Sequence, residues 1–87
     1  MTKQEILRHI DHTQLKAFCT WEDIKKLCDE AIEYNTASVC IPPSYIERIK
    51  ETYGDKINIC TVIGFPLGYN TTETKVFEVK DAIAKGC

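Results

Sequence analysis

Hydrophobic residues recur at intervals of three and four positions at the start of the chain, which predicts a short helix over residues 2–10. Its apolar face comprises Ile6, Leu7 and Ile10. Thr2 and Glu5 have the spacing of a capping box. A longer apolar stripe predicts a second helix after Thr20, whose hydroxyl can cap the free amides of the first turn, with Asp23 near the positive end of the helix dipole. This second stripe comprises Ile24, Leu27, Cys28, Ala31 and Ile32.

Two more segments have helical periodicity. In the first, Ser44 and Glu47 form another predicted capping box, and Gly54 can adopt the left-handed conformation that ends a helix. Its stripe comprises Ile46, Ile49 and Tyr53. The last predicted helix runs from about 71 to 85, is capped by Asn70 or Thr71, and is followed by Gly86 and Cys87. Its predicted inner stripe comprises Val76, Val79 and Ile83.

Three segments between these helices have the composition of β-strands. Ile10–Leu15 alternates briefly between apolar and polar residues, and Ser38–Ile41 is rich in small and β-branched residues before two prolines. Within Ile57–Ile63 and the residues just after it, the run "ICTVIGF" is almost continuously apolar. This pattern is typical of a strand covered on both faces, as in a parallel sheet.

The order of these elements predicts a single α/β domain over residues 1–87. An N-terminal helix, 2–10, precedes three strand–helix units at about 10–35, 36–54 and 56–86. Strands separated by single helices imply parallel pairing with right-handed crossovers. A sheet of only three such strands leaves an apolar edge, so we expect the chain alone to associate with further copies of itself.

Composition and charge narrow the functional classes. The formal net charge is −2 and both signs are interspersed, which predicts no nucleic-acid partner. The apolar runs are too short to cross a bilayer, and the polar N-terminus has no signal-peptide pattern, so we predict a cytoplasmic protein without a membrane partner. The five cysteines are odd in number and lack C-x-x-C spacing, which favours free thiols over disulfides. The two histidines have no paired cysteines beside them, so we predict no metal site. We also expect no cofactor.

Four stretches carry a resemblance to a known family: "IDHTQLK", "ASVCIPPSYI", "CTVIGFPLGYNTTETKVFE" and "AIAKGC". In order and spacing, from about Ile10 to Cys87, they resemble the N-terminal part of deoxyribose-phosphate aldolases. The resemblance implies the first three of eight units of a (β/α)8 TIM barrel. It also implies reversible cleavage of 2-deoxy-D-ribose 5-phosphate to D-glyceraldehyde 3-phosphate and acetaldehyde, through a lysine Schiff base and without a metal.

The resemblance assigns candidate roles to six residues of the first three strands and their loops. It implies that Asp11 is a carboxylate of the catalytic lysine network and that Cys40 faces the site. The residues that it implies at the substrate pocket are Thr13, Leu15, Val62 and Phe65. From the residues alone, Asp11 reads as a turn or cap residue, and Cys40, Val62 and Phe65 read as core. His12 is interpreted as structural, because neighbouring residues of a strand point to opposite faces.

The resemblance also implies what lies elsewhere. In the family, the Schiff-base lysine, a second active-site lysine, the proton-transferring aspartate and the phosphate-binding residues belong to later strands. Lys16 is the one lysine near a predicted site strand, and it matches no nucleophile of the family. Two hypotheses follow. In the first, the chain is part of an aldolase that acts on a phosphorylated sugar and needs either a complementing remainder of the barrel or a homo-oligomer. In the second, it is non-catalytic, either a self-associating α/β fragment or a small binding module.

Overall fold

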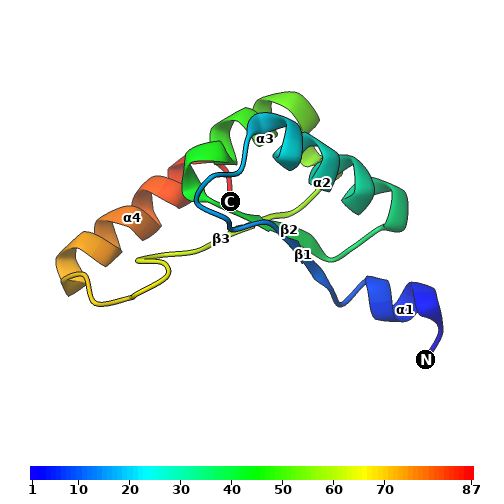
Figure 1. Ribbon diagram of the computed structural model, residues 1–87, viewed down its shortest axis with the longest axis horizontal. Helices are drawn as coiled ribbons and strands as arrows, with labels where there is room; N and C mark the ends of the chain where they lie inside the picture. Colours follow the sequence, from blue (N-terminus) through cyan, green and yellow to red (C-terminus); the bar gives the residue numbers. More distant parts are fainter.

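The computed structural model describes all 87 residues and contains one three-stranded sheet with helices between its strands (Figure 1). Two short 3₁₀ turns, η1 and η2, flank the third α-helix. The elements in chain order are α1 (Lys3–Leu7), β1 (Asp11–Thr13), α2 (Trp21–Tyr34), β2 (Ser38–Ile41), η1 (Pro43–Tyr45), α3 (Ile46–Tyr53), η2 (Gly54–Lys56), β3 (Ile59–Thr61) and α4 (Thr72–Lys85).

The three strands lie parallel and in sequence order, β1-β2-β3, which confirms the predicted α/β alternation. Each strand pair is separated by a helix, so every connection is a crossover. The lateral partners include Asp11 with Ser38, Thr13 with Cys40, and Cys40 with Cys60. The strands β1 and β3 are shorter than the predicted ranges, because only their central residues enter the ladder.

The hydrophobic core lies between one face of the sheet and the helices α2 and α3, which Figure 1 shows on the same side of the strands. Val39 and Ile41 alternate along β2, point toward these helices and are fully buried. The helical residues of the core are Ile24, Leu27, Cys28, Ala31, Ile46, Ile49 and Ala82. No helix of the chain has both the length and the apolar composition needed to span a membrane.

The helix caps follow the sequence signals at four places, and the first is Thr2, whose hydroxyl accepts from the Glu5 amide at the start of α1. Thr20 and Asp23 form a reciprocal capping box, with the Asp23 amide donating to the Thr20 hydroxyl at 3.3 Å and the Thr20 amide donating to Asp23 Oδ2 at 2.9 Å. The Thr71 hydroxyl accepts from the Thr74 amide at the start of α4. Gly86 ends α4 in the left-handed region, with φ of 119°.

The predicted capping box of Ser44 and Glu47 is wrong. The Tyr45 amide donates to the Pro42 carbonyl at 3.0 Å, which closes a 3₁₀ turn, and α3 then begins without a side-chain cap. Ser44 therefore lies inside the turn, where its backbone lacks the extended conformation of an N-cap residue. Proline at the first position of the turn favours this geometry because its φ is already near the helical value.

The predicted inner stripe of α4 is also wrong. Val76, Val79 and Ile83 are 45%, 39% and 62% exposed, whereas the buried residue of this helix is Ala82. The helix packs against α3 along a narrow face only, so most of its apolar residues contact solvent. For the same reason β3, predicted to be covered on both faces, is only half-buried. In α2, Ile32 likewise lies outside the buried stripe.

Candidate functional site

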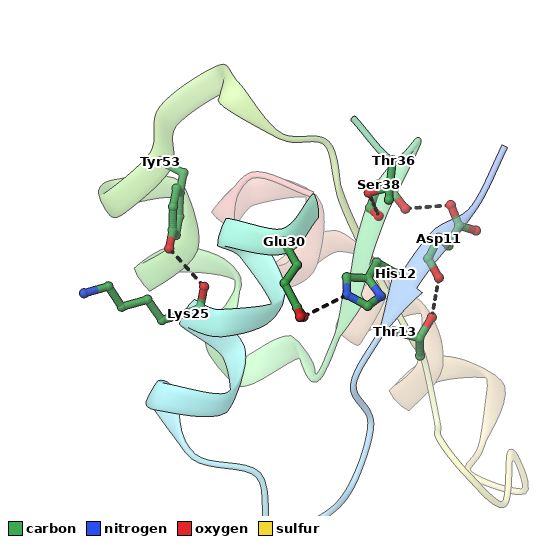
Figure 2. Close-up of polar contacts among 8 residues, drawn as sticks. All are labelled: Asp11, His12, Thr13, Lys25, Glu30, Thr36, Ser38 and Tyr53. Carbon is green, nitrogen blue, oxygen red and sulfur yellow. Dashed lines mark hydrogen bonds and ion pairs between the residues drawn. The ribbon is translucent and has the colours of Figure 1, made fainter. Parts of the chain in front are cut away.

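The face of the sheet opposite α2 and α3 carries polar side chains. Lateral partners in a parallel ladder point to the same side, and so do residues two apart along a strand. The open face therefore holds Asp11 and Thr13 of β1, Ser38 and Cys40 of β2, and Cys60 of β3. Between Asp11 and Thr13, His12 points the other way, as Figure 2 shows, and its Nε2 lies 3.2 Å from Glu30 Oε1 on α2.

The carboxylate of Asp11 is held in place from the neighbouring strand. The Ser38 hydroxyl donates to Asp11 Oδ1 at 2.6 Å, and the Thr13 hydroxyl donates to the backbone carbonyl of Asp11 at 2.7 Å (Figure 2). Ser38 is 8% exposed, whereas the Asp11 side chain is accessible. A carboxylate held in this way can orient an ammonium group or accept a proton on the open face.

Cys40 and Cys60 form a pair of thiols on the same face. Burial first, and then the charge and hydrogen bonding of Cys60 and the charge of Asp11, together raise the pKa of the Cys40 thiol from 9.0 to about 11. The Cys40 thiol is therefore protonated near neutral pH and a weak nucleophile. The family resemblance gave a role to Cys40 and none to Cys60, because the strand register is what places the two thiols side by side.

A cavity of about 460 Å³ opens at the carboxyl ends of the three strands. It is bounded by the loops that follow β1, β2 and β3, which is where α/β barrels place their sites. Three of the predicted pocket residues line it: Leu15, Val62 and Phe65. The other three, Asp11, Thr13 and Cys40, do not line this cavity and lie on the open face of the sheet.

Two charged residues that the sequence interpretation did not assign to the site also line the cavity, Lys16 and Glu78. The Lys16 ammonium lies 5.9 Å from the centroid of the exposed Phe18 ring. Glu78 belongs to α4 and lies 14 residues beyond its backbone partner Gly64. The residues around Glu78 in α4 are of mixed polarity, so the sequence pattern did not predict a contact with the loop after β3.

The loop after β1 is tied to the start of α3. The Tyr45 hydroxyl donates to the Cys19 carbonyl at 3.0 Å, and both residues line the cavity. The Trp21 and Tyr45 rings are stacked with centroids 6.3 Å apart, and the Arg48 guanidinium lies 4.2 Å from the Trp21 ring centroid. These contacts join the first two loops into one wall of the cavity.

Comparison with known proteins identifies the family to which the chain is similar. A profile of the DeoC/LacD family aldolases matches residues 6–87. The deoxyribose-phosphate aldolase of Clostridium botulinum (strain Alaska E43 / Type E3) is 69% identical over 86 residues, which cover 99% of this chain and 39% of that protein. The deoxyribose-phosphate aldolase of Clostridioides difficile (strain 630) is 66% identical over 83 residues, covering 95% of this chain and 38% of that protein.

The fold has matches among solved structures. The tetrameric deoxyribose phosphate aldolase from Aeropyrum pernix superposes with a TM-score of 0.92 at 30% identity, over 99% of this chain and 37% of that chain. An aldolase named QR15 superposes with a TM-score of 0.87, also at 30% identity, over 95% of this chain and 37% of that chain. The chain thus spans less than two-fifths of the length of these relatives. Its parallel strands and intervening helices are part of a TIM-barrel fold, and the chain belongs to the DeoC/LacD aldolase family.

Proposed function

We propose that this chain supplies the first part of the substrate cavity of a deoxyribose-phosphate aldolase. The reaction is the reversible cleavage of 2-deoxy-D-ribose 5-phosphate to D-glyceraldehyde 3-phosphate and acetaldehyde. The observation that carries this proposal is the cavity at the carboxyl ends of the parallel strands, in a chain of the aldolase family. Leu15, Val62 and Phe65 would form an apolar wall against the two-carbon part of the substrate.

The open face next to the cavity would serve the catalytic lysine. Asp11, oriented by Ser38, would orient and balance an ammonium group, while Thr13 and Cys40 would border the substrate. A lysine that forms an imine must be neutral, which requires desolvation or a neighbouring cation. Lys16, the lysine at the cavity, is exposed. We therefore assign the Schiff base to a lysine outside these 87 residues.

The proposed setting is a cytoplasmic enzyme that acts as a homo-oligomer on a small phosphorylated sugar, without nucleic-acid or membrane partners. The Aeropyrum pernix relative is tetrameric, which supports the oligomeric part of this proposal. The exposed apolar residues of α4, Val76, Phe77 and Ile83, favour an alternative in which the chain alone is a non-catalytic, self-associating unit.

The test compares the 87-residue chain with a chimera in which it replaces the matching segment of the Clostridium botulinum aldolase. We expect the chimera to cleave 2-deoxyribose 5-phosphate and the chain alone to show no turnover. In the chimera, Asp11→Asn should lower kcat by about a hundredfold or more, since a positioned carboxylate contributes that much to acid–base catalysis.

Borohydride reduction in the presence of acetaldehyde locates the imine. We expect a single labelled lysine in the part of the chimera contributed by the relative, and no label on the chain alone. Lys16→Arg in the chimera should leave the label in place. A stoichiometric adduct on a lysine of the 87 residues, lost in Lys16→Arg, would show that this chain has its own nucleophile and would overturn the assignment.

A further inference from the structure

The loop after β3 folds back on itself beside the cavity. The Gly68 amide donates to the Gly64 carbonyl at 2.6 Å, which closes the turn Gly64–Gly68. Both glycines have positive φ, 62° and 73°, a region that other residues adopt only with strain. Gly64 is buried, whereas Phe65 is 53% exposed and lines the cavity together with Pro66. The turn therefore presents an apolar ring to the cavity, and the hydrogen bond between Gly68 and Gly64 closes its backbone from within.

One face of α4 binds the backbone of this turn. Glu78 Oε1 accepts a hydrogen bond of 2.7 Å from the Gly64 amide, and Lys75 Nζ donates to the Gly68 carbonyl at 2.9 Å. The aliphatic part of Lys75 also packs on Gly64, since its Cδ lies 3.2 Å from the point that a Cβ of Gly64 would occupy. Lys75 and Glu78 are three residues apart, so both side chains leave the helix on the same side. Figure 1 shows the loop, in yellow, alongside α4.

The two side chains have opposite charges, yet they form no ion pair with one another. Each instead binds the backbone of the turn, at opposite ends of the Gly64–Gly68 segment. A carboxylate that accepts from a buried amide makes a stronger hydrogen bond than a neutral acceptor, and its removal leaves that amide without a partner. The bond from Glu78 is the part-buried one of the pair, whereas the bond from Lys75 is exposed.

We propose that Glu78 is a positioning residue, which through the Gly64 amide holds the Gly64–Gly68 turn so that Phe65 faces the substrate cavity. This inference rests on the proposed aldolase function. Glu78 itself has one carboxylate oxygen committed to the turn and forms part of the cavity wall. Glu78 therefore affects substrate binding through the position of Phe65. Other groups contact the reacting atoms.

The test uses the chimera defined above, with the KM for 2-deoxyribose 5-phosphate and kcat measured separately. Glu78→Met removes the acceptor at similar volume, and KM should rise about tenfold, which corresponds to one lost hydrogen bond, while kcat changes by less than about threefold. Glu78→Gln keeps an acceptor oxygen and should restore most of the affinity. Lys75→Met, which removes the exposed bond, should raise KM less than Glu78→Met. The matched control is Glu73→Met, because Glu73 is an exposed residue of α4 without a side-chain bond.

A second measurement follows the turn directly, in the 87-residue chain. Hydrogen exchange at the amides of Gly64 and Gly68 should become faster in Glu78→Met and remain unchanged in Glu73→Met. An inactive unsubstituted chimera would overturn the proposed function, while the exchange result would still decide whether Glu78 holds the turn. An active chimera in which Glu78→Met leaves KM unchanged would overturn the positioning role. A loss of kcat alone, with KM unchanged, would also overturn it, because Glu78 would then act on the reacting atoms.

Discussion

Ser38 and Asp11 face each other across the β1–β2 ladder, and the buried Ser38 hydroxyl donates to the exposed Asp11 carboxylate at 2.6 Å. The bond joins residues 27 positions apart in the chain. It gives the one carboxylate on the open face of the sheet a defined direction. Because hydrogen bonds to charged groups are stronger than neutral ones, it also contributes to the stability of the strand pair.

Ser38→Ala should lower the free energy of unfolding by about 2 kcal/mol, because it removes a charge-assisted hydrogen bond from a buried hydroxyl. Urea unfolding of the chimera measures the change. Ser44→Ala is the matched control, since Ser44 is exposed and its hydroxyl makes no hydrogen bond, and its effect should stay within about 0.5 kcal/mol. Equal stability of the two variants would contradict the role assigned to the Ser38–Asp11 bond.

Tyr45→Phe should lower the free energy of unfolding by about 1 kcal/mol while keeping the stack on Trp21. The variant removes only the hydroxyl that donates to the Cys19 carbonyl, so the loop after β1 loses its tie to α3. Equilibrium unfolding of the chimera gives the value. Tyr34→Phe serves as control, because Tyr34 is 50% exposed and its hydroxyl has no partner. A loss of the same size in Tyr34→Phe would show that the Cys19 contact contributes nothing specific.

The 87-residue chain alone should self-associate in a concentration-dependent manner, because α4 exposes Phe77 at 73% and Ile83 at 62%. Covering apolar surface is favourable by about 25 cal/mol per Å². Sedimentation velocity measures the effect, and the double variant Phe77→Glu with Ile83→Lys should shift the chain toward monomer. The double variant Lys25→Glu with Glu33→Lys is the control, because it also changes two exposed helix residues and should leave the association unchanged. A monomer at all concentrations for the unsubstituted chain would contradict the prediction.

Stability should fall as the pH rises from about 9 to about 11, in part because of Cys28. Burial first, and then the charge of Asp29, raise the pKa of the Cys28 thiol from 9.0 to about 11 in the folded chain. Between these values the unfolded state has lost the proton that the folded state keeps. The contribution of Cys28 is therefore fully present below pH 9 and is lost through pH 11.

Urea midpoints of the chimera at pH 8, 9 and 10 measure this dependence. Cys28→Ala should show a shallower fall in stability with pH than the unsubstituted protein, whatever its stability at pH 8. Cys87→Ala is the control, because Cys87 is exposed and its removal should leave the slope unchanged. Identical slopes for Cys28→Ala and the unsubstituted protein would show that the Cys28 thiol ionises alike in both states.

Elements with local signals can be predicted from the order of residues alone. Thr20 and Asp23 lie three residues apart, so their capping box could be read from spacing alone, and Gly86 is a C-cap for the same reason. The strand–helix alternation also gave the parallel order of the sheet, because single-helix crossovers leave few other topologies. For the site, Leu15, Val62 and Phe65 were assigned from the family resemblance, and all three line one cavity.

Which apolar faces are buried, and which side chains meet, depends on the packing of the folded chain. The α4 stripe of Val76, Val79 and Ile83 has the same periodicity whether or not a neighbour covers it, and here the burial falls on Ala82. The Ser38–Asp11 and Glu78–Gly64 bonds join residues 27 and 14 positions apart. Strand register and helix docking place these partners, and both depend on packing summed over the whole chain, so no local pattern reveals them.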